Sequence, residues 1–401
     1  MEISNIDTEA LSYRIKRYER GYLTVDLDAV VGNMKSMAEN LEDGVGMIGI
    51  VKADGYGHGA VKIAQTISPY VEFMAVATAD EAIILRRHGI DKPILVLGVT
   101  GENRFSELLE YDIRPTIFQY EKAEKLSKTA VSMGKKGKIH LAVDTGMSRI
   151  GMMPDSKSLE MVRKMSRLPG VELEGIFTHF SRADETDKGC TNEQYVKFSS
   201  FISELEESGI HIPVRHCANS AGIIDLKSMN MDMVRAGISI YGLYPSDEVV
   251  KKLVPLQPVM GWKSFVSYVK TVPEGTPVSY GGTFVTEKET IVATVPIGYA
   301  DGYLRSLSGV GSVLIHGQRA PILGRICMDQ MMADVSAIED VKEGDCVTLI
   351  GKDGNEEITV EELAELSGGF HYEILCTVGK RIPRVYYTDG KPVDAKDYFF
   401  E

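Results

Sequence analysis

Short apolar runs alternate with longer amphipathic stretches along residues 22–240. The apolar runs are rich in β-branched residues and predict nine strands, which are Tyr22–Leu27, Gly46–Val51, Glu72–Ala77, Pro93–Leu97, Arg114–Phe118, Lys138–Asp144, Val171–Thr178, Pro213–Cys217 and Asp232–Arg235. Apolar residues with helical spacing follow Asp28, which is a predicted N-cap. A second segment with this spacing covers Thr191–Gly209 and ends at a glycine. Strand–helix alternation of this kind predicts parallel pairing through right-handed crossovers. We therefore expect an α/β fold with a (β/α)8 barrel, in which one of the nine strands is surplus.

The pattern changes after about Pro255. Short runs separated by turn signals predict a mostly β region, with strands at Ser264–Thr271, Thr290–Pro296, Gly311–Ile315, Gln330–Val335 and Cys346–Ile350. Only Val360–Ser367 has the spacing of a helix there. We expect an N-terminal extension at 1–20, the barrel at 21–254 and a β-rich domain at 255–401. The extension is either an ordered helix or a frayed end.

Composition narrows the class of protein. The 401 residues are 44% hydrophobic and 25% charged, which is ordinary for a globular protein, and no apolar run reaches the roughly 18–20 residues that cross a bilayer. The net charge of −13 opposes nucleic-acid binding. The charged N-terminal residues do not resemble a secretion signal. Five cysteines without CxxC spacing predict thiols in a reducing, cytoplasmic compartment, and no histidine or cysteine cluster indicates a metal site.

Lys52 stands at the carboxyl end of the predicted strand Gly46–Val51, where barrel enzymes build their sites. The segment Lys52–Gly59 (KADGYGHG) contains three glycines that let a ligand approach the backbone, and it precedes a helix whose free N–H groups favour an anion. A reactive lysine beside a phosphate-sized niche is what a Schiff-base cofactor requires. By itself, a lysine in this place is more often a solvated charge.

The segment Lys52–Gly59 resembles the lysine motif of the alanine racemase family, which binds pyridoxal 5′-phosphate. Further matching segments follow in the family's order, namely Asp144–Arg149, Thr178–Phe180, Ala218–Ser220, Val234–Ile238, Val278–Gly281, Gly298–Gly302, Gly324–Gln330 and Arg381–Arg384. The resemblance covers roughly residues 21–388. It implies a cytoplasmic, homodimeric isomerase with a barrel and a β domain, which supplies D-alanine for peptidoglycan. It also implies that Tyr22–Leu27 joins the second domain.

The resemblance assigns a role to each candidate residue. Racemisation needs a base on each face of Cα, and these are Lys52 and, from the partner subunit of a head-to-tail dimer, Tyr280. Arg235 would bind the pyridine nitrogen and leave it unprotonated, and His179 would link Arg235 with the tyrosine. The remaining assignments are Tyr56, Asn219, Ser220, Gly237 and Ile238 for the cofactor, Arg149 and Met328 for the substrate carboxylate, and Asp184, Arg305, Arg325 and Lys380 for the access corridor. Each of these residues could instead have a purely structural role. Tyr280 could be an aromatic residue at the edge of a hairpin turn, His179 could be a hydrogen-bonded histidine of the core, and Arg235 and the corridor residues could form surface ion pairs.

Two positions depart from the family pattern. Ala142 stands where the family commonly has a lysine, often carbamylated, that orients the arginine matching Arg149; we therefore expect another acceptor or a bound anion to hold Arg149. Lys380 replaces a tyrosine that packs against the catalytic tyrosine, so the pocket could admit serine. The alternatives to an alanine racemase are thus a serine or broader racemase, a non-catalytic pyridoxal-phosphate-binding protein, and a related decarboxylase, which Arg235 argues against.

Overall fold

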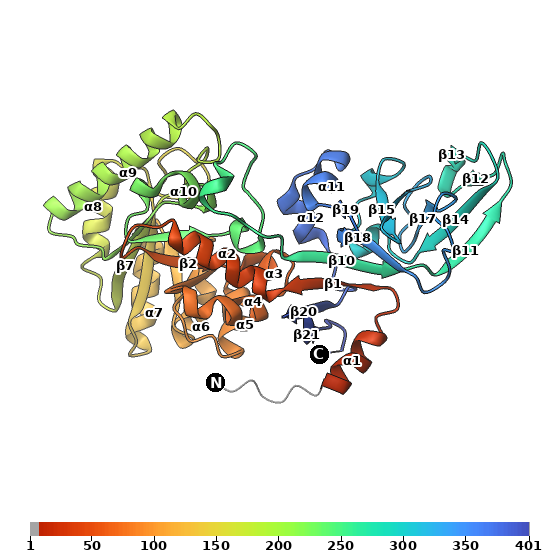
Figure 1. Cartoon of the computed structure of the whole chain (residues 1–401). Helices are drawn as coiled ribbons and strands as arrows, with labels where there is room; N and C mark the ends of the chain where they lie inside the picture. The colour runs from red at the N-terminus through yellow and green to blue at the C-terminus, as the bar shows by residue number, and fades with distance from the viewer. Residues whose placement is uncertain (1–7, 401) are drawn as a thin grey trace. The chain divides into compact units, whose positions relative to one another are not determined.

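The computed structural model describes residues 8–400 and divides into two compact units (Figure 1). One unit contains residues 29–55 and 60–258, and the other contains the described residues before 29, residues 56–59 and those from 259 onward. Each unit has its own buried core and is described by itself. No helix of residues 8–400 is both long enough and apolar enough to cross a membrane.

The first unit is a closed barrel of eight parallel strands, as the alternating pattern predicts. The strands are β2 (Gly46–Ile50), β3 (Phe73–Val76), β4 (Ile94–Val96), β5 (Ile113–Ile117), β6 (Gly137–Ala142), β7 (Val171–Phe177), β8 (Val214–His216) and β9 (Met233–Ala236). Helix α2 (Leu27–Glu39) precedes β2. Helices follow the strands β2 to β8, namely α4 (Ala60–Ile67), α5 (Ala79–Arg87), α6 (Phe105–Glu110), α7 (Tyr120–Ser132), α8 (Ser156–Met165), α9 (Gly189–Glu207) and α10 (Ser220–Asp225). The barrel closes where β2 pairs with β9, in a register that sets Ile48 opposite Arg235. Strands such as β3 are buried along their whole length, because helices cover the outside and side chains fill the inside.

The helix after β1 (Gly21–Asp26) does not begin with an Asp28 cap as predicted. Asp28 lies inside the first turn of α2, and its backbone N–H donates to the Asp26 carboxylate at 2.9 Å. The strand runs directly into the helix, so the last strand residue supplies the acceptor for the first free N–H groups.

The second unit is built on a mixed eight-stranded sheet in the order β16-β15-β18-β10-β1-β20-β21, with β19 paired to β18. In addition to β1, the sheet contains β10 (Met260–Phe265), β15 (Ser312–Ile315), β16 (Gln318–Pro321), β18 (Cys346–Asp353), β19 (Glu356–Ile358), β20 (Arg384–Thr388) and β21 (Lys391–Lys396). Strand β1 pairs antiparallel with β10 and parallel with β20. A three-stranded sheet of β11 (Tyr268–Val272), β14 (Thr290–Val295) and β17 (Met331–Asp334), and the hairpin of β12 (Pro277–Val278) and β13 (Phe284–Val285), complete the strands.

Several details of this unit differ from the sequence prediction, which did not include β12, β13, β16, β19, β20 or β21. The expected strand Ser264–Thr271 is two strands, β10 and β11, because the chain passes from one sheet to the other at residues 266–267. Val266 still bonds Asp345 in the first sheet, whereas Ser267 already bonds Thr294 in the second. A second helix, α12 (His371–Thr377), follows α11 (Val360–Ser367); it buries too few apolar side chains to leave a periodic signal.

The N-terminal segment is helical where the structure describes it. Helix α1 (Thr8–Lys16) carries Leu11, which is buried in a small apolar cluster with Tyr18, Val385 and Ala395 of the same unit. An ordered extension is therefore the correct alternative for residues 8–16, and residues 1–7 lie outside the described part of the chain.

Candidate active site

Lys52 lies immediately beyond the carboxyl end of β2 and is half-buried. The backbone that follows it is unusual, because Ala53, Asp54 and Gly55 all adopt left-handed conformations with φ between 51° and 63°. Two bonds hold this turn: Ala53 N–H donates to Glu81 Oε1 at 2.7 Å, and the Asp54 carboxylate accepts from the first N–H of α4 at 2.9 Å. Left-handed non-glycine residues cost free energy and mark sites whose geometry the surroundings enforce. Lys52 thus sits on a fixed turn.

The glycines after Lys52 have a different purpose from the one expected. A side chain at Gly57 would collide with the Leu375 carbonyl, and one at Gly59 would collide with the Tyr386 hydroxyl. Both glycines allow close packing within their own unit, so the expectation that they open the backbone to a ligand is not supported at these two positions. His58 between them does not point to solvent; it is buried, with Nδ1 2.9 Å from the Tyr56 carbonyl.

Arg235 of β9 is a buried guanidinium, 3% exposed, with neutral partners. Nη1 donates to Nδ1 and the carbonyl of His216 at 2.8 and 3.0 Å. Nη2 shares its two N–H groups among three acceptors, which are the carbonyls of Thr178 and Cys217, both at 2.8 Å, and His179 Nδ1 at 3.0 Å. Burial lowers the pKa of Arg235 to about 10, and the Cys217 thiol opposes the shift. Even so, the group stays charged near pH 7, and no carboxylate of the described residues pairs with it.

The bonds from Arg235 fix the protonation of two imidazole rings. A guanidinium only donates, so Nδ1 of His179 and of His216 must each be an acceptor, and each neutral ring carries its proton on Nε2. His216 Nε2 lies 3.0 Å from His140 Nδ1 and can donate to it. Burial first, and then the charge of Arg235, hold the pKa values of His179 and His216 well below the usual range. Both rings are therefore neutral at physiological pH.

Three cations from different loops act on His179. After burial, the charges that lower its pKa are those of Arg235, Arg149 and Lys52, which belong to or follow β9, β6 and β2. These residues are far apart in sequence, and barrel closure brings their side chains to one mouth. A cluster of positive charges of this kind attracts phosphate and carboxylate groups.

Arg149 has no hydrogen-bond or ion-pair partner among residues 8–400. It is exposed in the loop after β6, and no acceptor within residues 8–400 lies at hydrogen-bond distance from its guanidinium. Ala142 is buried at the end of β6 and offers only a methyl group. The expectation that another side chain holds Arg149 is thus not supported by the described residues. That a bound anion holds it stays a prediction.

Two predicted cofactor residues lie at the start of α10. The Ser220 hydroxyl accepts from the backbone N–H of Gly237 at 3.1 Å and of Ser239 at 3.4 Å, next to Ile238. Asn219 is the N-cap of α10, since its Oδ1 accepts from Gly222 N–H at 3.1 Å. Tyr56 is described with the other unit, where burial raises the pKa of its phenol, so it is a neutral donor.

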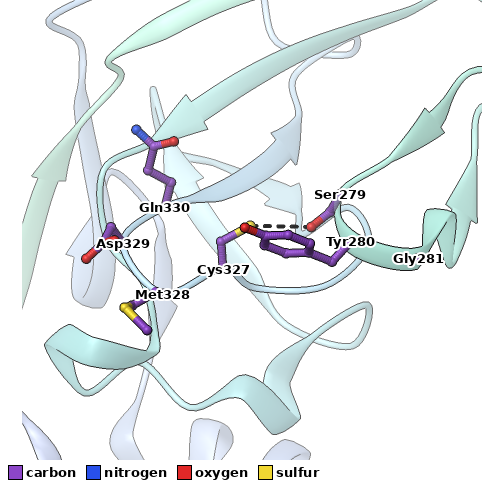
Figure 2. A pocket seen from close by; sticks show the side chains of 7 residues that line it. All are labelled: Ser279, Tyr280, Gly281, Cys327, Met328, Asp329 and Gln330. Carbon is purple, nitrogen blue, oxygen red and sulfur yellow. Dashed lines mark hydrogen bonds between the residues drawn. The ribbon is translucent and has the colours of Figure 1, made fainter.

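Tyr280 and Met328 line a pocket of about 730 Å³ in the second unit (Figure 2). Its lining residues are Ser279, Tyr280, Gly281, Cys327, Met328, Asp329 and Gln330. Tyr280 is 69% exposed, and its hydroxyl has no bonding partner in the described chain. The preceding Ser279 is anchored, because its Oγ lies 2.5 Å from the Arg325 carbonyl and 3.5 Å from Cys327 Sγ. The tyrosine therefore projects from a backbone that is itself held in place.

The four predicted corridor residues do not form the surface ion pairs that were the alternative. Arg305, Arg325 and Lys380 are exposed in the second unit, and Asp184 is half-buried in the barrel unit. None of the four makes an ion pair with another residue of the described chain.

Sequence reasoning missed His216 and His140, which connect Arg235 to the barrel interior. Each lies within a predicted strand, and both are fully buried. A polar residue within an apolar strand could have indicated a buried hydrogen bond. The sequence does not show which residue is the partner in that bond. Among residues 8–400 there is no group of three histidine, cysteine or acidic side chains suited to a metal ion.

A lysine at the end of a barrel strand, in a mouth that attracts phosphate and carboxylate groups, defines the class of barrel enzymes that carry pyridoxal 5′-phosphate. The sequence matches the alanine racemase N-terminal domain family over residues 25–245 and the alanine racemase C-terminal domain family over residues 259–386. The chain belongs to the alanine racemase family, whose members are pyridoxal-phosphate-dependent isomerases.

Known relatives resemble the chain over nearly its full length. An alanine racemase of Clostridium tetani is 48% identical over 376 residues, which cover 93% of this chain and 97% of that protein. One of Methanococcus maripaludis is 47% identical over 363 residues, 90% of this chain and 97% of that protein. The solved alanine racemase of Clostridium difficile 630 superimposes with a TM-score of 0.92 at 38% identity, covering 95% of this chain and 99% of that one.

Proposed function

We propose that the chain interconverts L-alanine and D-alanine with pyridoxal 5′-phosphate held on Lys52. The observation that carries this proposal is the pairing of β2 with β9, which brings Lys52 to the same end of the barrel as the buried Arg235 and its bond to His179. An amino-acid substrate brings a carboxylate and the cofactor brings a phosphate, so both fit a mouth with three cations. The names of the relatives support alanine as the substrate.

The chain offers donors that suit the cofactor. Arg235 uses both Nη groups on neighbours in the barrel, whereas its Nε–H has no acceptor among residues 8–400. This remaining donor suits an aromatic ring nitrogen, which accepts one hydrogen bond. The Ser220 hydroxyl and the backbone at Gly237 and Ile238 form a small polar cluster that suits a phosphate group. Asn219 supports it by capping α10, and Tyr56 adds a neutral phenol donor.

Two side chains would move the proton of the substrate. The cofactor, when bound, makes the Cα proton acidic by drawing electron density from the carbon. Lys52 Nζ would accept or return that proton on one face, and the Tyr280 hydroxyl would do so on the opposite face, which inverts the centre. Arg235 rarely gives up a proton, even with its lowered pKa, so it would hold the ring nitrogen without protonating it.

We propose a head-to-tail homodimer in which Tyr280 and Met328 serve the site of the partner subunit. The exposure of these two side chains, 69% and 52%, supports this, since nothing in their own unit covers them. Arg149 and the Met328 backbone would bind the substrate carboxylate, and Asp184, Arg305, Arg325 and Lys380 would line the access corridor.

We further propose that the enzyme works in the cytoplasm and supplies D-alanine for peptidoglycan. The absence of a disulfide among the five cysteines, all of which lie in the described part of the chain, supports a reducing compartment.

The test is racemisation in D2O. Purified protein with pyridoxal 5′-phosphate is incubated with L-alanine and, separately, with L-serine. We expect deuterium at Cα with inversion, and at least a tenfold larger kcat/KM for alanine, which is about 1.4 kcal/mol in transition-state binding. Release of CO2 would identify a decarboxylase, an equal rate with serine would identify a broader racemase, and borohydride trapping on a residue other than Lys52 would refute the scheme.

A further inference from the structure

Gln194 of α9 is a buried carboxamide, 1% exposed, between two loops of the barrel mouth. Its Nε2 donates to Thr145 Oγ1 at 3.3 Å and to the His179 carbonyl at 3.1 Å. Its Oε1 accepts from the backbone N–H of Ser181 at 2.9 Å and from the Ser181 hydroxyl at 3.1 Å. An amide side chain has two donors and two acceptor positions, and all four are used here. The orientation of the group is therefore fully determined.

These bonds connect Gln194 with the loop of Arg149 and with the residues that contact Arg235. Thr145 opens the loop that carries Arg149, and its hydroxyl lies 2.8 Å from that of Thr178. The carbonyl of Thr178 and the ring of His179 both accept from Arg235. Gln194 thus joins the loop after β6 to the loop after β7, and through the latter to the buried guanidinium.

The side chain of Arg149 does not hold its own loop, because it has no acceptor in the described part of the chain. Its backbone turns through left-handed conformations at Gly146 and Ser148, with φ of 144° and 55°. The Asp144 carboxylate accepts from the N–H groups of both, at 2.9 and 3.0 Å. Only backbone placement can therefore set the position of Arg149 before a ligand binds.

We propose that Gln194 is a positioning residue of the racemase, which holds the Arg149 loop against His179 and so places the guanidinium that receives the substrate carboxylate. The inference rests on the proposed function, because it assigns the carboxylate to Arg149. Neither an apolar side chain nor a carboxylate can replace the amide. Leucine would leave the His179 carbonyl and the Ser181 N–H without partners, and glutamate would lose the donation to the carbonyl.

The experiment compares Gln194→Leu and Gln194→Glu with a matched control, Thr191→Val. Thr191 lies one turn earlier on α9, is fully buried, and its hydroxyl has no bonding partner in the described residues. Each variant is measured as the cofactor-loaded enzyme in two ways, by KM and kcat for L-alanine and by the rate of trypsin cleavage after Arg149. The cleavage rate reports how firmly the loop is held and does not depend on turnover.

We expect Gln194→Leu to raise KM for alanine at least tenfold while kcat falls less than threefold, and to speed cleavage after Arg149 at least fivefold. Gln194→Glu should show the same changes at smaller size, because it keeps the Ser181 contacts. Thr191→Val should change each quantity less than twofold. In an Arg149→Ala background, adding Gln194→Leu should raise KM less than twofold, since the two residues act through one contact.

The proposal is overturned if folded Gln194→Leu has the KM and cleavage rate of the parent, or if its KM effect is undiminished without Arg149. If Gln194→Leu does not fold, Gln194→Glu and Thr145→Val carry the same comparison. A parent enzyme that does not racemise alanine would refute the proposed function, whereas the cleavage rates would still decide whether Gln194 holds the loop.

Discussion

Acid should destabilise this protein through histidines that the fold keeps neutral. Burial lowers the pKa values of His140, His179 and His216 below their usual range, most strongly for the last two. In the unfolded chain the same rings titrate near pH 6.5. Below about pH 6.5 these histidines therefore bind more protons in the unfolded state than in the folded state. Stability from these groups is present above about pH 6.5 and is lost as the pH falls below it.

The expected magnitude follows from proton linkage. Between pH 6 and pH 5 an unfolded histidine is protonated for most of the interval, so a ring that stays neutral in the folded state costs up to about 1.2 kcal/mol of unfolding free energy. The three rings together can remove at most about 3.6 kcal/mol, compared with the roughly 5–15 kcal/mol that stabilises a typical domain.

The assay is urea unfolding followed by far-UV circular dichroism at pH 6 and pH 5, on the parent, His140→Gln and His211→Gln. His140 suits the test because it does not contact Arg235, and its neighbour Glu174 keeps ion pairs with Arg114 at 3.0 Å and Lys138 at 3.1 Å. We expect His140→Gln to lose less unfolding free energy than the parent over this interval, by at most about 1.2 kcal/mol, because Glu174 partly opposes the effect of burial on the His140 pKa. His211 has a 75% exposed side chain, and its variant is the control that should lose as much as the parent. Equal losses in the parent and His140→Gln would refute the reasoning.

Three further predictions follow from single side chains. Arg384→Met should lower the unfolding free energy by about 3–5 kcal/mol in a denaturant titration, because its guanidinium donates only to buried backbone carbonyls, including that of Gly57 at 2.9 Å. Tyr280→Phe should slow racemisation at least about 100-fold, while deuterium exchange at Cα with retention continues at the face served by Lys52. Lys380→Tyr should lower the serine-to-alanine ratio of kcat/KM about tenfold, or about 1.4 kcal/mol, because a rigid ring would narrow the pocket that a flexible cation leaves open.

Much of the fold could be predicted because each strand of the barrel carries a local signal. A strand covered by helices on one side and by the barrel interior on the other must be apolar along its length, as Phe73–Val76 is. The predictions failed where the deciding contact lies outside the predicted segment. The break after Phe265 depends on Thr294 and Asp345, and the cap of α2 depends on where β1 ends.

The sequence by itself determined the alternation of strands and helices, the place of Lys52 beyond a strand, and the family to which the motifs belong. Only the tertiary structure decided how the site is held together. Arg235 meets His179 and His216, and Gln194 meets Thr145, across 19 to 56 residues of chain. The physical reason is that a buried donor must find an acceptor wherever barrel closure brings one, and no local pattern records that partner.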